Sequence, residues 1–212
     1  QPAITKADVD RAAAVAALVK AQTLRAKGDK ALAKQARTLF QASIDASKSA
    51  GDACGMRDAY VALAGLEHEV VDAAAQKAAA QAALDQPCEG RVAERALAQR
   101  LLGSASINQG DFAAGTRETE RAVASFKETG DVYQQGIALR NLGLAYAESG
   151  EVEKALSITH AALDAAQAAG DQKLLALVHN DLAFMYNARG EFALAVDGYR
   201  QTLETLRANP YQ

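Results

Sequence analysis

Residues 139–156 read LRNLGLAYAESGEVEKAL, which is a helix-forming segment, a turn at Ser149-Gly150 and the start of a second helix-forming segment. The same pattern returns 40 residues later around Gly190, and it appears 40 residues earlier before Gly110. A pattern that recurs at a fixed period predicts an array of similar units, each of which packs on the next. The sequence therefore predicts a repeat protein.

The composition of the 212 residues favours helices. Half of the residues are hydrophobic, aromatic residues make up 5%, and there are three Pro and no Trp. The net charge of -3 is small and basic residues do not cluster, which argues against nucleic acid or an anionic membrane as the main partner. No apolar run approaches the roughly 20 residues of a membrane-spanning helix, so membrane insertion is not expected.

Glycines mark the expected helix ends, because Gly tolerates the left-handed conformation that ends many helices. Two sets alternate along the chain, at Gly51, Gly90, Gly130 and Gly170 and at Gly110, Gly150 and Gly190. Asp52, Asp131 and Asp171 follow three of them, where a carboxylate can cap the next helix. We therefore predict an all-α, right-handed solenoid of five antiparallel helical hairpins, at about residues 5–50, 52–89, 91–129, 131–169 and 171–208.

The repeats resemble the tetratricopeptide repeat family. The family pattern of a Leu-Gly pair, a Tyr, a turn Gly and small residues is matched by Leu142, Gly143, Tyr146, Gly150, Ala155 and Ala162. The next repeat keeps Leu182, Tyr186, Gly190 and Ala195, and the preceding one keeps Leu102, Gly103, Gly110 and Ala122. The first two hairpins match by period and Gly placement only, and Val70-Val71 stands at the middle turn of the second. The period of about 40 resembles the longer variety found in bacterial signalling regulators and CHAT-type proteins.

This resemblance implies a concave groove lined by the first helix of each hairpin. At a period of 40, one row of equivalent positions is Tyr60, Arg100, Arg140 and Asn180, and the next row is Val61, Leu101, Asn141 and Asp181. Arg and Asn on a preformed wall suit an extended peptide backbone or a carboxylate, although Asp181 would repel the latter. The alternative is that Arg100 and Arg140 are solvated or paired with nearby Glu.

We expect a non-catalytic scaffold that binds a protein or peptide in this groove, with no cofactor and no metal. An alternative is a ligand-sensing input region of a larger signalling or effector protein. A second alternative is an enzyme that uses Glu67, His68 and His179. Against it, Glu67-His68 has no second His at helical spacing, and the Cys and His residues give no zinc-ligand spacing.

The two cysteines lie near the two ends of the second hairpin, Cys54 after its start and Cys88 before its end. These places meet at the same end of an antiparallel hairpin, so we predict a disulfide between them. Such a bond favours an oxidising compartment, hence a periplasmic or secreted protein in place of a cytoplasmic one. The alternative is two unrelated, buried small side chains.

The sequence of the last hairpin predicts that the repeat array continues after it. Its second helix carries an apolar stripe and no polar cap, at Phe192, Val196, Tyr199, Leu203 and Leu206. Asn209-Pro210 suits the start of another helix, so residues 209–212 are expected to open a truncated sixth repeat. The open face would then be covered by self-association. The alternative is a frayed tail after five hairpins.

Overall fold

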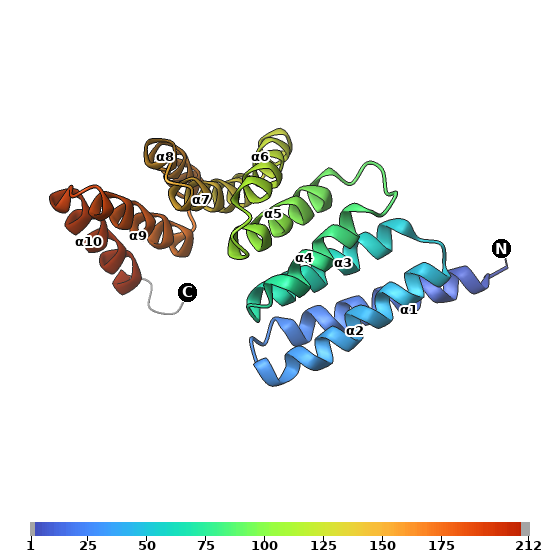
Figure 1. Cartoon of the computed structure of the whole chain (residues 1–212). Coiled ribbons are helices and arrows are strands. Elements are labelled where there is room, and N and C mark those ends of the chain that lie inside the picture. The colour runs from blue at the N-terminus through green and yellow to red at the C-terminus, as the bar shows by residue number, and fades with distance from the viewer. Residues whose placement is uncertain (1–2, 209–212) are drawn as a thin grey trace. The chain divides into compact units, whose positions relative to one another are not determined.

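The computed structural model describes residues 3–208, and these fold into α-helices joined by short turns (Figure 1). The helices are α1 (Lys6–Arg25), α2 (Lys30–Ser49), α3 (Ala53–Glu69), α4 (Ala73–Leu84), α5 (Val92–Asn108), α6 (Phe112–Thr129), α7 (Val132–Glu148), α8 (Val152–Ala169), α9 (Gln172–Ala188) and α10 (Phe192–Ala208). The all-α fold is confirmed. Residues 209–212, where the sequence predicts a sixth repeat, lie outside the described residues.

The helices group into two compact units, which divide between Gln109 and Gly110. In the first unit α1 packs on α2 and α3 on α4, and these hairpins join through α2 on α3 and α4 on α5. In the second unit α7 packs on α8 and α9 on α10, with α6 on α7 and α8 on α9. The first helices of neighbouring hairpins also touch, as α1 with α3, α3 with α5, and α7 with α9. No helix of the described part is long and apolar enough to cross a bilayer.

The turns have the conformation that the glycines predict. Eight residues have φ between 65° and 80°, namely Gly28, Gly51, Gly90, Gly110, Gly130, Gly150, Gly170 and Gly190. Val71 has φ 63° at the turn between α3 and α4, where the sequence offers no Gly. Asp side chains then accept a backbone N–H at most helix starts, as Asp131 does from Gln134 at 3.0 Å. Thr5 and Asp8 form a complete capping box at the start of α1.

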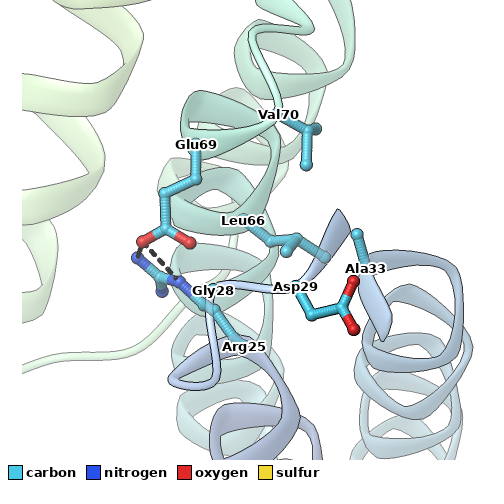
Figure 2. A pocket seen from close by; sticks show the side chains of 7 residues that line it. All are labelled: Arg25, Gly28, Asp29, Ala33, Leu66, Glu69 and Val70. Atoms are coloured by element: carbon cyan, nitrogen blue, oxygen red, sulfur yellow. Dashed lines mark hydrogen bonds and ion pairs between the residues drawn. The ribbon is translucent and has the colours of Figure 1, made fainter. Parts of the chain in front are cut away.

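The first unit has two buried clusters, one between α3, α4 and α5 with Leu101 and Leu102, and one between α1, α2 and α3. Phe40 and Leu66 are buried there among alanines, which let the helix backbones approach closely. Figure 2 shows one end of this core, where Leu66 of α3 extends toward the turn between α1 and α2, near Ala33. Beside it, Arg25 Nη2 forms an ion pair with Glu69 Oε1 at 2.7 Å. Apolar packing and one charged pair therefore join α1 and α2 to α3.

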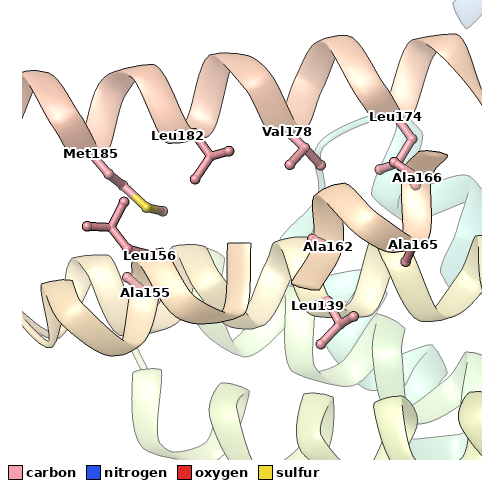
Figure 3. Packing of buried hydrophobic residues seen from close by; sticks show 10 residues of the cluster. All are labelled: Leu139, Ala155, Leu156, Ala162, Ala165, Ala166, Leu174, Val178, Leu182 and Met185. Atoms are coloured by element: carbon pink, nitrogen blue, oxygen red, sulfur yellow. The ribbon is translucent and has the colours of Figure 1, made fainter. Parts of the chain in front are cut away.

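The core of the second unit lies between α7, α8 and α9. Leu174, Val178, Leu182 and Met185 follow one side of α9 and face the alanines of α8 (Figure 3). Gly143 of the Leu-Gly pair lies against Thr159 of α8 so closely that a Cβ at position 143 would collide with the Thr hydroxyl. The pair thus has a packing role, since its glycine lets α7 and α8 approach.

The second hairpin is closed by contacts that are specific to it. Its helix α4 has only 12 residues, and residues 85–91 form a loop after it (Figure 1). Buried Arg57 of α3 donates to the carbonyl oxygens of Ala83, Gln86 and Cys88, at 3.3, 2.5 and 2.6 Å. Cys54 and Cys88 are joined by a disulfide, with their Cα atoms 5.0 Å apart. Arg57 and the disulfide therefore both hold this loop against α3.

Candidate functional site

The observed helix starts move the expected groove positions of the second hairpin by one residue. The N-caps of α3, α5, α7 and α9 are residues 52, 91, 131 and 171, so the second hairpin is one residue shorter than the 40-residue period. Counting nine residues from each N-cap gives Val61, Arg100, Arg140 and Asn180. Val61 therefore takes the place that the period assigned to Tyr60. In the next row Ala62 likewise replaces Val61, while Leu101, Asn141 and Asp181 stay.

The predicted residues divide between the two units. Tyr60 and Arg100 lie half-buried on α3 and α5 of the first unit. Arg140 and Asn141 on α7, with Asn180 and Asp181 on α9, belong to the second unit. The four on α7 and α9 share an interface, because these two helices are in contact. The predicted residues of the second unit therefore belong to one surface, which α7 and α9 form together.

This surface, which we name the α7/α9 face, also carries apolar side chains. On α9 the exposed residues recur every three or four positions, at Lys173, Leu177, Asn180 and Phe184. Their counterparts 40 residues earlier on α7 are Tyr133, Ile137, Arg140 and Leu144. Phe184 is 56% exposed, Tyr133 43% and Leu177 39%. The α7/α9 face is thus a mixed surface of large apolar side chains, the amide of Asn180 and the cationic Lys173 and Arg140.

The other two sides of α9 explain why this face is open. Val178 and Leu182 point into the core with α7 and α8. On another side, Gly198 of α10 lies against Ala183, where an added Cβ would be 3.0 Å from the Ala183 Cβ. The positions of Leu177 and Phe184 remain, and no helix of the second unit covers them. The sequence alone gives little sign that Phe184 is exposed, because a large apolar residue usually indicates core. Its counterpart on α7, Leu144, is in fact half-buried.

A partly buried ion pair joins α7 to α9 at the base of this surface. Arg140 Nε lies 2.6 Å from Asp181 Oδ2, and Arg140 Nη2 donates to Asp181 Oδ1 at 3.3 Å. Burial raises the pKa of Asp181, while the Arg140 charge and hydrogen bonds from Arg140 and Asn180 act to lower it. Arg140 is therefore paired with an Asp of the neighbouring repeat, and not with Glu as the alternative supposed. A partner carboxylate would have to compete with Asp181 for this guanidinium.

The hollow in Figure 2 lies in the first unit and has a volume of about 190 Å³. Its lining residues are Arg25, Gly28, Asp29, Ala33, Leu66, Glu69 and Val70. Its charged groups are already engaged, since Arg25 pairs with Glu69 and Asp29 accepts the Ala31 N–H at 2.7 Å. These contacts secure the turn between α1 and α2, so we assign the hollow a structural role.

The three residues of the catalytic alternative have separate surroundings. Glu67 is buried and accepts from Arg37 of α2, with Nε to Oε1 at 2.6 Å. His68 Nδ1 lies 3.3 Å from the Gln76 side-chain oxygen on α4, and burial lowers the pKa of His68. His179 lies on α9 of the second unit, where burial lowers its pKa as well. Among residues 3–208, no three His, Cys, Asp or Glu side chains are grouped as metal ligands would be.

Comparisons with known proteins agree with this architecture. The model of the tetratricopeptide repeat family matches residues 134–208. No curated protein matches the sequence. Among solved structures, BtubC (BKLC) from P. vanneervenii is 17% identical with a TM-score of 0.66, over 99% of this chain and 94% of that one.

Two further solved structures have the same fold. The pilF protein of Pseudomonas aeruginosa is 15% identical with a TM-score of 0.69, over 92% of this chain and 78% of that one. The TPR-like repeats of a putative kinesin light chain from Podosopora anserina are 15% identical with a TM-score of 0.69, over 92% and 96% of the two chains. At such identities the likeness concerns the fold alone.

Proposed function

Because residues 134–208 belong to the tetratricopeptide repeat family, we propose that the chain is a non-catalytic scaffold that binds a peptide segment of a partner protein on its α7/α9 face. Repeats of this family generally serve protein interaction without catalysis. The observation that carries the proposal is the exposure of Tyr133, Leu177 and Phe184 on one face. Large apolar groups that gather on a surface mark interaction sites, and burying the exposed part of each would contribute about 1 kcal/mol.

The polar groups of the α7/α9 face suit a peptide backbone. Asn180 is exposed between Leu177 and Phe184, and an amide side chain can both donate to and accept from a peptide unit. The Arg140–Asp181 pair holds α7 and α9 together below the surface. A surface that is ordered before binding loses less entropy on binding. The expected ligand is therefore a segment with spaced apolar side chains, and its affinity need not depend on a carboxylate.

Peptides selected from a random phage-displayed library on the wild-type protein provide the test. We expect Phe184→Ala to weaken binding of the selected peptides by about tenfold or more, because a buried aromatic contact is lost. Phe192→Ala is the matched control, since Phe192 is also exposed but lies on α10, outside the face. Isothermal titration calorimetry measures both. The proposal fails if peptides bind Phe184→Ala and Leu177→Ala as tightly as wild type, or if they depend on Phe192.

The Cys54–Cys88 bond supports a periplasmic or secreted location for this scaffold over a cytoplasmic one, because disulfides persist in oxidising compartments. The apolar stripe of α10 is exposed at Phe192, Val196, Tyr199, Leu203 and Leu206. Self-association through that stripe stays a prediction.

A further inference from the structure

A second hollow of the first unit, of about 110 Å³, lies among α1, α2 and α3. Its apolar wall includes Val15 and Leu18 of α1. Its polar wall includes Ser47 of α2, with Asp52 and Asp58 at the N-terminal end of α3. Arg91, which precedes α5, completes this side of the hollow. All of these residues belong to the first unit, so the site is independent of the α7/α9 face.

Two buried oxygen atoms in this wall lack a hydrogen-bond partner among the described residues. They are Ser47 Oγ, on a side chain that is 1% exposed, and Asp58 Oδ1. The other Asp58 oxygen, Oδ2, accepts from Arg91 Nη1 at 2.5 Å. An ionised carboxylate can only accept, and leaving a buried polar atom without a partner is unfavourable. Asp58 Oδ1 therefore requires a hydrogen-bond donor, and the Ser47 hydroxyl, which can both donate and accept, can accept from the same group.

A third oxygen, Asp52 Oδ2, lies near Ser47 Oγ, beside Gly55. A Cβ at Gly55 would lie 2.7 Å from Asp52 Oδ2 and 2.8 Å from Ser47 Oγ. The missing side chain at Gly55 thus lets Asp52 Oδ2 and Ser47 Oγ both lie close to the α3 backbone at this position. Asp52 Oδ1 is occupied, because it accepts the Gly55 backbone N–H at 2.9 Å. Acceptor oxygens from α2 and α3 therefore border the same small space.

The charges around the hollow favour a cation. Two guanidinium groups are present, of which Arg11 pairs with Asp8 at 3.1 Å and Arg91 lies 3.8 Å from Glu94 as well as on Asp58. The lining itself holds two carboxylates, Asp52 and Asp58, and these two guanidiniums; Asp8 and Glu94, which lie outside the lining, offset part of the guanidinium charge. Burial raises the pKa of Asp58, Arg91 acts against this, and Glu94 and Asp52 add to it. The Asp58 carboxylate is thus incompletely compensated by its surroundings.

We propose that this hollow binds a primary ammonium group, carried by a small amine or by the amino-terminal residue of a peptide. The group has three N–H donors, which match Ser47 Oγ, Asp58 Oδ1 and Asp52 Oδ2, and one positive charge. Its alkyl part would lie against Val15 and Leu18. A volume of about 110 Å³ limits the bound part to a few heavy atoms. A site of this kind is what the ligand-sensing alternative requires.

The test is a titration of the full, ¹⁵N-labelled chain followed by the amide signals of Ser47, Gly55 and Asp58. Ethylammonium chloride represents a small amine, and alaninamide represents a peptide amino terminus. We expect saturable shifts with one or both, and the stronger of the two identifies the source of the ligand. N-acetylalaninamide, which lacks the ammonium group, and sodium chloride at equal ionic strength are expected to give no saturable shift at these residues.

Two variants localise the effect. Asp58→Asn keeps the shape and is expected to weaken binding by about tenfold or more, because a charged hydrogen bond is lost. Asp45→Asn, on the exposed side of α2, is the matched control and should bind as wild type does. Should Asp58→Asn fail to fold, Ser47→Ala takes its place with the same expected direction. Absence of saturable shifts, equal shifts with sodium chloride or N-acetylalaninamide, or unchanged affinity in these variants would overturn the proposal.

Discussion

Val71 holds the left-handed backbone conformation that glycines hold at the other turns. Its φ is 63°, and its side chain is 83% exposed, so no packing compensates for the conformation. A β-branched residue in this region is an outlier, because the left-handed conformation costs an L-residue roughly 1–2 kcal/mol. The surrounding contacts of α3 and α4 thus impose a turn that the residue itself disfavours.

We expect Val71→Gly to stabilise the protein by about 1 kcal/mol, since the relief of strain exceeds the added entropy of the unfolded chain. Urea unfolding followed by circular dichroism measures the change. Gly150→Val is the control with opposite sign, because Gly150 has φ 79° and valine there would introduce the same strain. A loss of stability in Val71→Gly would contradict this account of the turn.

Local patterns predict the turns but not the exposure of single side chains. Gly110, Gly150 and Gly190 mark helix ends, because their conformation is set by the residue itself. A uniform period of 40 residues places Tyr60 in the groove row in place of Val61, because the second hairpin is one residue shorter than that period. Phe184 was missed for another reason: whether an apolar residue is buried depends on which helix covers it, and a period does not reveal this.

Among the elements, α4 and the loop after it depend most on individual side chains. Arg57 donates to three carbonyl oxygens at the end of α4 and in its loop, two of which, Ala83 O and Gln86 O, also accept a backbone N–H. The sequence offers little sign of this role, because arginine is mostly an exposed residue. The hairpin periodicity therefore predicts α4. It does not predict that Arg57 holds the loop after α4 against α3, which only the structure reveals.

Replacing Arg57 by Met should destabilise the first unit by about 2–3 kcal/mol, because three hydrogen bonds from a charged, buried guanidinium are lost at once. The measurement is the free energy of unfolding in urea. Arg95→Met is the matched control on α5, where the arginine is exposed, and it should change stability by less than about 0.5 kcal/mol. Equal effects of the two substitutions would show that Arg57 does not anchor the loop.

For the whole molecule, the division into two units predicts that damage in one is felt weakly in the other. The Cys54–Cys88 bond closes a loop with a sequence separation of 34 residues inside the first unit. Removing it should cost about 4 kcal/mol in the chain-entropy model. In repeat proteins each unit interacts with its neighbours only, so the loss should be greatest near α3 and α4.

Hydrogen exchange read out by mass spectrometry tests this prediction. The Cys54→Ser, Cys88→Ser protein should lose protection in α3 and α4, while α7 and α9 keep theirs. Intact-mass analysis of the unreduced wild-type protein, after thiol alkylation, provides the control and should show no alkylated cysteine. Two alkylated cysteines, or an equal loss of protection in both units, would contradict it.

The packing of helices mainly on their neighbours in the chain also bears on how the protein is made. A helix that needs only the one or two before it can pack as soon as it leaves the ribosome, without waiting for distant segments. Both cysteines lie in the hairpin of α3 and α4 and the loop that follows it, so their bond does not require the second unit to be folded. Synthesis would then proceed by adding hairpins to a part that is already folded.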